Sequence, residues 1–196
     1  MDRLLWASIL LISGSAYAGP KLSAEHTAQI EAGEVVVIPK KPTNDVGVAA
    51  RSYGLVNEAI GIVWPVVRDC QHYHKFMPRT AKSEVRERNG DSMKCYTQVE
   101  MPFPLSDMWS LVRSTIKRTP EGTFHRRWSL IEGTYSRLNG QWSAYPWGDE
   151  GKRTLLVYDL DVNPKISVPD FIIRKAQTGT LPDVYEAIRK RVESLR

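Results

Sequence analysis

The motif Cys70-x-His72-x-His74 comes nearest to a metal site in its residue types. Thiolate and imidazole groups are good zinc ligands, and alternate residues of a strand share one face. However, the segment is expected to follow a helix, and no fourth ligand is evident in a chain with 4 histidines. We therefore expect no metal here. Tyr73 is expected to pack at the edge of the core, with His72 and His74 exposed.

Motifs for covalent or phosphate chemistry are missing from the sequence. It contains no G-x-S-x-G elbow and no glycine-rich phosphate loop. His125 falls in a predicted strand beside two arginines, where an exposed position on the outer face is expected. The acidic pair Asp149 and Glu150 falls in a predicted turn. The sequence thus predicts no catalytic residue and no cofactor, and it favours a protein that is not an enzyme.

A set of aromatic residues is the better candidate for function. Trp128, Trp142 and Tyr158 each lie in the middle of a predicted strand, in phase with apolar neighbours. That phase is expected to face the C-terminal helix. Trp and Tyr bring a polar tip into an apolar cavity, where it can orient an oxygen of a ligand. Plain core packing is the alternative for each of them.

Arg126 has the same strand phase as Trp128. If its side chain points inward, the buried guanidinium needs an acidic partner or a ligand carboxylate or phosphate. The alternative is a bulge that reverses the phase and leaves Arg126 in solvent.

These residues lie on a series of predicted strands. Two come first, over residues 34–39 and 48–55, and a proline-containing helix after Asn57 follows them. Pro65 is expected to bend or interrupt that helix. Six more strands are predicted over 80–87, 92–100, 108–117, 123–131, 141–147 and 153–161, with turns between them, including one over 133–140. Short links between consecutive strands predict an antiparallel meander.

A long helix is predicted at the C-terminus, and it is the element that can cover the sheet. One apolar stripe at three- and four-residue steps is formed by Leu181, Val184, Tyr185, Ile188, Val192 and Leu195. Thr180 is expected to cap this helix, with Asp183 completing a weak capping box. A helical piece through Phe171 is expected to precede it and to end at Gly179.

Size, charge and the N-terminus limit the classes of protein. The chain has 196 residues, of which 42% are hydrophobic, and this suits a single domain with a real core. Its net charge of +5 comes from mixed charges, so a solvated surface is expected and not a nucleic-acid interface. Residues 1–18 resemble a signal peptide with cleavage after Ala18, leaving a domain over 19–196. An exported protein, periplasmic or secreted, is therefore expected.

Two cysteines remain in the mature chain, Cys70 and Cys95. In an oxidising compartment they can form a disulfide. The sequence leaves open whether their side chains meet.

Four stretches, taken in order, are similar to a known family. They are residues 63–69 with Tyr73, Phe76 and Pro78 after them, residues 140–146, residues 154–158, and residues 168–172 with the entry to the last helix. Together they resemble the START-like superfamily, also called the polyketide cyclase or helix-grip superfamily, and in particular its coenzyme Q-binding and polyketide cyclase/dehydrase branch. The resemblance implies an α+β helix-grip fold, in which a curved antiparallel sheet wraps around a long C-terminal helix. It also implies a cavity for a largely apolar ligand, without implying a reaction.

The sequence therefore predicts an exported protein that encloses a hydrophobic small molecule such as a lipid, isoprenoid or quinone. The residues expected to line the cavity are Trp128, Trp142, Tyr158, Phe171, Tyr185, Ile188 and Arg126. We expect a monomer with no cofactor, no nucleic-acid partner and no stable membrane insertion. Two alternatives stay open: a cyclase or dehydratase-like enzyme that uses the same cavity, and an envelope interaction protein with a filled cavity.

Overall fold

The computed structural model describes residues 19–166 and 180–196, and its centre is one antiparallel sheet of eight strands. The spatial order is β1-β2-β8-β7-β6-β5-β4-β3, so β3 to β8 form a meander and β1–β2 close onto β8. The strands are β1 (Val36–Lys40), β2 (Val48–Val56), β3 (Thr80–Asn89), β4 (Ser92–Val99), β5 (Met108–Arg118), β6 (Phe124–Gly133), β7 (Tyr135–Trp147) and β8 (Arg153–Pro164).

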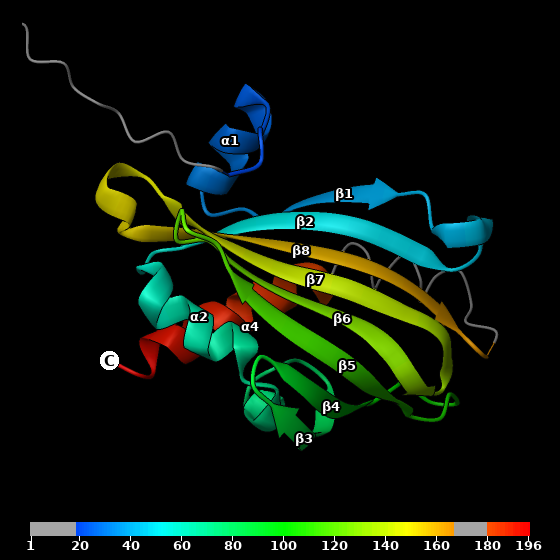
Figure 1. Cartoon of the computed structure of the whole chain (residues 1–196). Coiled ribbons are helices and arrows are strands. Elements are labelled where there is room, and N and C mark those ends of the chain that lie inside the picture. The colour runs from blue at the N-terminus through cyan, green and yellow to red at the C-terminus, as the bar shows by residue number, and fades with distance from the viewer. Residues whose placement is uncertain (1–18, 167–179) are drawn as a thin grey trace, which may run out of the picture.

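Helices lie on both faces of the curved sheet (Figure 1). The inner face carries α2 (Ile60–Arg68) and α4 (Leu181–Glu193), which also contact each other. On the outer face, α1 (Ala24–Glu31) packs Ile30 against β1, β2 and β8. The short 3-10 segments are η1 (Thr43–Asp45), η2 (Cys70–Lys75) and η3 (Asp149–Gly151). This is the expected helix-grip architecture.

Pro65 lies inside helix α2, and of its two expected effects, a bend or an interruption, the interruption does not occur. Proline removes one backbone hydrogen bond from a helix. The neighbouring side chains Val63, Trp64, Val66 and Val67 are all buried under the sheet. Burial of that apolar face outweighs the lost bond, and the helix continues to Arg68.

Strand β7 is longer than predicted, and the expected turn over residues 133–140 is wrong. Residues 135–140 continue the strand, and a register shift against β8 falls between Tyr135 and Arg137. A bulge of this kind adds one residue to one strand and locally shifts the alternation of its side chains. The regular inside–outside pattern on which the sequence prediction relied is therefore broken at this point.

The start of α4 also differs from its prediction. Thr180 has helical backbone angles, φ −69° and ψ −34°, and its side chain makes no capping hydrogen bond. Pro182 occupies the first turn, where an amide donor has no intrahelical partner to lose. The expected helical piece through Phe171 and its end at Gly179 lie outside the described residues.

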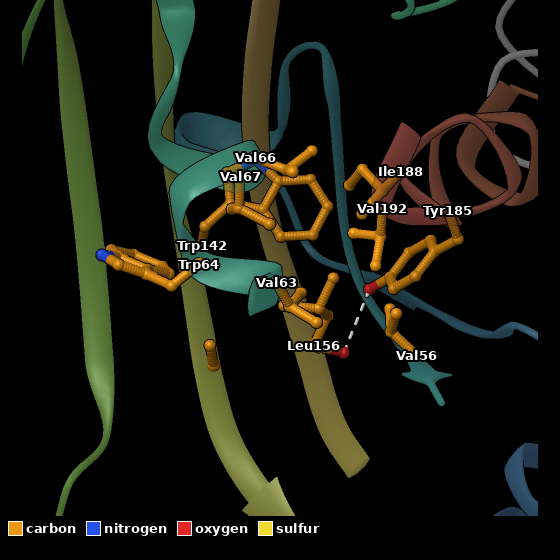
Figure 2. Packing of buried hydrophobic residues seen from close by; sticks show 11 residues of the cluster. Val56, Val63, Trp64, Val66, Val67, Trp142, Leu156, Tyr185, Ile188 and Val192 are labelled. Atoms are coloured by element: carbon orange, nitrogen blue, oxygen red, sulfur yellow. Dashed lines mark hydrogen bonds between the residues drawn. The ribbon is translucent and has the colours of Figure 1, made fainter. Parts of the chain in front are cut away.

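The main core joins α2 and α4 to the inner face of β2, β7 and β8 (Figure 2). At its centre Tyr185 is fully buried, and its hydroxyl donates to the Leu156 carbonyl at 3.3 Å. The same hydroxyl lies 3.2 Å from Ser52 Oγ on β2. A Cβ on Gly54 would come within 2.6 Å of the Tyr185 ring, so only glycine leaves room for this tyrosine.

A disulfide between Cys70 and Cys95 links η2 to β4, with the two Cα atoms 6.3 Å apart. Both cysteines are buried in a small cluster with Met93 and Val112. The disulfide therefore fixes the segment after α2 against the sheet.

Candidate ligand-binding cavity

A cavity of about 320 Å³ lies on the inner face of the sheet, beside the packed core. Strands β3 to β8 form its wall, η2 and Met77 close one side, and Thr180 and Val184 contribute from the start of α4. Its apolar lining includes Met77, Val99, Val112, Leu138, Leu160 and Val162. The inner face is thus divided into a part that α2 and α4 fill and a part that stays hollow.

The structure brings four of the predicted site residues together on this cavity: Arg126, Trp128, Trp142 and Tyr158. Two others, Tyr185 and Ile188, are fully buried in the packed core and are not part of the lining. The reason is that α4 presents its apolar stripe to α2 and to the sheet at once, and these two side chains fall on the filled side. Phe171 lies outside the described residues.

The aromatic residues form one continuous wall. Trp142 stacks on Tyr158 with ring centroids 4.2 Å apart, and Trp128 lies tilted against Tyr158 at 5.8 Å. Gly140 pairs with Trp128 across β6 and β7. A Cβ at Gly140 would come within 2.2 Å of the Trp128 ring, so the absence of a side chain lets this indole lie across β7.

Arg126 points inward, which settles the open question about its phase. Only 3% of its surface is exposed. Its Nε donates to Ser114 Oγ at 2.8 Å, and its Nη1 donates to the Tyr73 hydroxyl at 2.5 Å and to the Val67 carbonyl at 3.4 Å. The guanidinium also lies near the rings of Tyr73 and Trp128, at 5.4 and 5.8 Å from their centroids. All of these partners are electrically neutral.

Three tyrosines bring hydroxyl groups to the same cavity. Burial raises the pKa of Tyr135 to about 12 and raises the pKa of Tyr158 further. Burial also raises the pKa of Tyr73, although the charge of Arg126 and its hydrogen bond oppose that shift. All three therefore remain neutral phenols near neutral pH. Tyr73 donates its O–H to the Val67 carbonyl, whereas the hydroxyls of Tyr135 and Tyr158 can donate to a ligand.

Tyr73 and Tyr135 are cavity residues that the sequence did not single out as ligand-binding. Tyr73 was expected only to pack at the edge of the core, and its hydroxyl contacts to Val67 and Arg126 depend on tertiary structure. Tyr135 fell in a predicted turn, and the bulge that follows it brings it to the same face as Leu138. No sequence signal marked that bulge.

In the Cys70-x-His72-x-His74 motif, Cys70 is in the disulfide and so offers no thiolate to a metal ion. His72 Nδ1 lies 2.7 Å from an Asp69 oxygen, and His74 Nδ1 lies 2.9 Å from Ser83 Oγ. His74 is exposed, whereas His72 is half-buried.

A second hollow, of about 620 Å³, lies on the outer face of the sheet. Its residues are mainly charged and polar, and Arg51 pairs there with Asp159 at 2.7 Å. This hollow is larger, but it lacks the apolar walls that are typical of sites for small molecules. We therefore place the candidate site in the cavity on the inner face.

Fold and site together define a helix-grip protein with a largely apolar cavity on the inner face of its sheet. The sequence profile of the family described as polyketide cyclase / dehydrase and lipid transport matches residues 61–189. The chain therefore belongs to this family. Membership implies the binding of a hydrophobic ligand or a cyclase-like activity.

Solved structures share the fold at low sequence identity. The STAR-related lipid transfer protein from Xanthomonas axonopodis is 17% identical, with a TM-score of 0.70 over 90% of this chain and 98% of that one. Human StAR-related lipid transfer protein 5 is 15% identical, with a TM-score of 0.69 over 83% of each chain. The Zhui aromatase/cyclase from Streptomyces sp. R1128 is 16% identical, with a TM-score of 0.56 over 83% of this chain and 97% of that one. No curated protein matches the sequence.

Proposed function

We propose that this protein is an exported binding protein that encloses a hydrophobic small molecule, such as a lipid, isoprenoid or quinone, in the cavity on the inner face. The observation that supports this most directly is the hollow of about 320 Å³ with its wall of Val, Leu, Met and aromatic side chains. Transfer of an apolar ligand from water into such a space is favourable by about 25 cal/mol for each Å² buried, before ordering costs.

Export is supported by two features of the chain. Residues 1–18 have the short apolar run and the small residues before Gly19 that are typical of a signal peptide. The Cys70–Cys95 disulfide fits an oxidising compartment. In the described part of the chain, no helix is long and apolar enough to cross a membrane. N-terminal sequencing of the protein from the envelope fraction tests export, and we expect the mature chain to begin at Gly19.

The binding function is tested by native mass spectrometry of protein purified from its own host's envelope, followed by organic extraction. We expect a reproducible apolar mass that co-purifies with the protein. A clean apo mass, together with no thermal shift from a panel of lipids and quinones, would contradict the proposal.

A matched pair of variants on α4 connects that ligand to this cavity. Val184 lines the cavity, whereas Glu186 is exposed on the same helix. Val184→Trp places a bulky ring in the hollow and is expected to lower ligand occupancy at least tenfold. Glu186→Trp introduces the same side chain away from the cavity and is expected to leave occupancy unchanged. Equal occupancy in the two variants would place the ligand elsewhere.

A cyclase-like enzyme is the second candidate, and the convergence of Arg126, Tyr73, Tyr135 and Tyr158 on the cavity favours retaining it. A tyrosine hydroxyl can act as a general acid, and a guanidinium can stabilise a developing oxyanion. The described cavity lining contains no histidine or carboxylate to act as a base. Turnover of an aromatic polyketide-like substrate with a pH-dependent rate would support the enzyme, and loss of this turnover in Tyr158→Phe would locate the chemistry.

The third alternative, an interaction protein, required a filled cavity, which the hollow on the inner face disfavours.

A further inference from the structure

Arg126 is a buried positive charge that lacks a negative partner in the described structure. Its contacts are a serine hydroxyl, a tyrosine hydroxyl and a backbone carbonyl, and no described carboxylate lies within ion-pair distance. An arginine side chain stays protonated in proteins, so it cannot escape burial by losing its charge. A buried charge is costly unless a charge of opposite sign compensates it.

One donor group of this guanidinium is left without a partner. Nε and Nη1 make all the hydrogen bonds that the described residues offer, and none of these residues accepts from Nη2. Arg126 is 3% exposed and forms part of the cavity lining. The free N–H groups of Nη2 are therefore available to an occupant of the cavity.

Tyr158 shares a row of paired residues with Arg126 on the wall of the cavity, because Trp142 pairs with both. Tyr135 and Tyr158 both line the cavity, and no described residue is hydrogen-bonded to either hydroxyl. Tyr135 pairs with Pro164 at the end of β8, beyond Val162, so it lies at the opposite end of the cavity from Arg126. One cation and two hydroxyl donors thus occupy a cavity whose remaining walls are mainly apolar.

We propose that the ligand has an acidic oxygen head group, a carboxylate or a phosphate, which accepts hydrogen bonds from Arg126 Nη2 and from the Tyr158 hydroxyl. This inference rests on the proposed binding function and narrows its ligand class to an acid with an apolar body. The acid supplies a negative charge that no described residue gives to Arg126, and the apolar part fills the space toward Val99 and Val162. Tyr73 acts as a positioning residue, because its hydroxyl accepts a hydrogen bond from Nη1 and so fixes the guanidinium beside the cavity.

The test compares three ligands that each contain ten carbon atoms: decanoate, decyl phosphate and 1-decanol. A cavity of 320 Å³ holds roughly ten non-hydrogen atoms at the volume of about 30 Å³ that a water occupies in the liquid. Binding is measured by isothermal titration calorimetry on the wild-type protein after removal of co-purified ligand. We expect at least one acid to bind about 10- to 100-fold more tightly than decanol, as charge-assisted hydrogen bonds allow. The acid that binds more tightly shows whether the head group of the ligand is a carboxylate or a phosphate.

Variants then test whether Arg126 causes the tighter binding of an acid relative to decanol. Arg126→Gln is expected to lower the acid affinity to that of decanol and to leave decanol binding within about threefold. Arg127→Gln removes the same charge from the outer face of β6 and is expected to change neither affinity. Tyr73→Phe keeps the charge but removes the hydroxyl that holds Nη1, and a several-fold smaller preference for the acid is expected. Circular dichroism and thermal melting check that each variant folds.

The outcomes separate this inference from the binding function. If decanol binds the wild-type protein as tightly as both acids, the acidic head group is wrong while the apolar cavity stands. If an acid is preferred and Arg126→Gln keeps that preference, another residue binds the head group and the inference also fails. If none of the three ligands binds, the proposed binding function is contradicted together with it. The wild-type comparison decides the question even if Arg126→Gln does not fold.

Discussion

The indole of Trp142 stacks flat on the phenol ring of Tyr158, with ring centroids 4.2 Å apart and planes 8° from parallel. Trp142 also packs against Tyr185 in the packed core, with ring centroids 5.7 Å apart and planes 70° from parallel. Trp142 is 3% exposed, so it belongs to the core and to the cavity wall together. This one residue marks the boundary between the filled and the hollow part of the inner face.

Because of this double role, Trp142→Ala is expected to damage folding and binding together. Truncation of a buried tryptophan lowers the free energy of unfolding by about 3–5 kcal/mol. Trp128→Ala, at a partly exposed cavity residue, is expected to lower ligand retention with a smaller loss of stability. Urea denaturation and native mass spectrometry measure the two effects. Unchanged stability of Trp142→Ala with complete loss of ligand would show that Trp142 serves the ligand alone.

Gly140 is expected to be intolerant of a side chain because Trp128 occupies its space. An added Cβ would lie 2.2 Å from the Trp128 ring and 2.8 Å from the Asp159 carbonyl oxygen. Gly140→Ala therefore displaces the indole and lowers the free energy of unfolding by about 1–3 kcal/mol. Gly61→Ala in α2 is the control, since nothing lies within 4 Å of its Cβ and alanine favours a helix. Equal stability of the two variants would contradict this packing.

The alternation of side chains in strands explains how much of the site could be predicted. Arg126, Trp128, Trp142 and Tyr158 lie mid-strand, where period-two alternation holds, and all four line the cavity. Tyr135 could not be predicted, because the bulge after it shifts the alternation.

The division of the inner face could not be predicted either. A helical stripe predicts which residues of α4 are buried, and Tyr185 and Ile188 are indeed buried. It does not reveal whether a buried residue meets a ligand or another helix. That depends on how far α2 extends under the sheet, which is a property of the tertiary structure.

Removal of the Cys70–Cys95 disulfide is expected to weaken both the fold and the ligand site. The crosslink joins residues 25 positions apart, and closing such a loop stabilises the protein by roughly 3 kcal/mol on the chain-entropy estimate. It also holds η2, which contains Tyr73, against β4. Urea denaturation with and without dithiothreitol measures the loss of stability. In the control, dithiothreitol should have no further effect on the double variant Cys70→Ala, Cys95→Ala. Two reactive thiols in the untreated, denatured protein would contradict the disulfide.

Glu31 connects α1 to the ends of β7 and β8, and its contribution to stability is expected to depend on pH. Its carboxylate accepts hydrogen bonds from Arg153 Nη1 at 2.6 Å and from Trp147 Nε1 at 2.7 Å. The hydrogen bond from Arg153, followed by that from Trp147, lowers the pKa of Glu31 below its ordinary value of 4.5. A carboxyl whose folded-state pKa is depressed stabilises the protein above its unfolded-state pKa, and this stabilisation is lost as the pH falls through the folded-state value.

Glu31→Gln is therefore expected to lower the free energy of unfolding at neutral pH and to have a smaller effect at about pH 3. The effect at neutral pH should be about 1 kcal/mol or less, since the Glu31 side chain is 38% exposed and solvent screens its ion pair. Glu34→Gln, an exposed position on the same segment, is the control and should change stability little at either pH. Urea denaturation at both pH values measures the difference. A loss of stability in Glu31→Gln that stays constant between the two values would show that the shape of the side chain matters there and its charge does not.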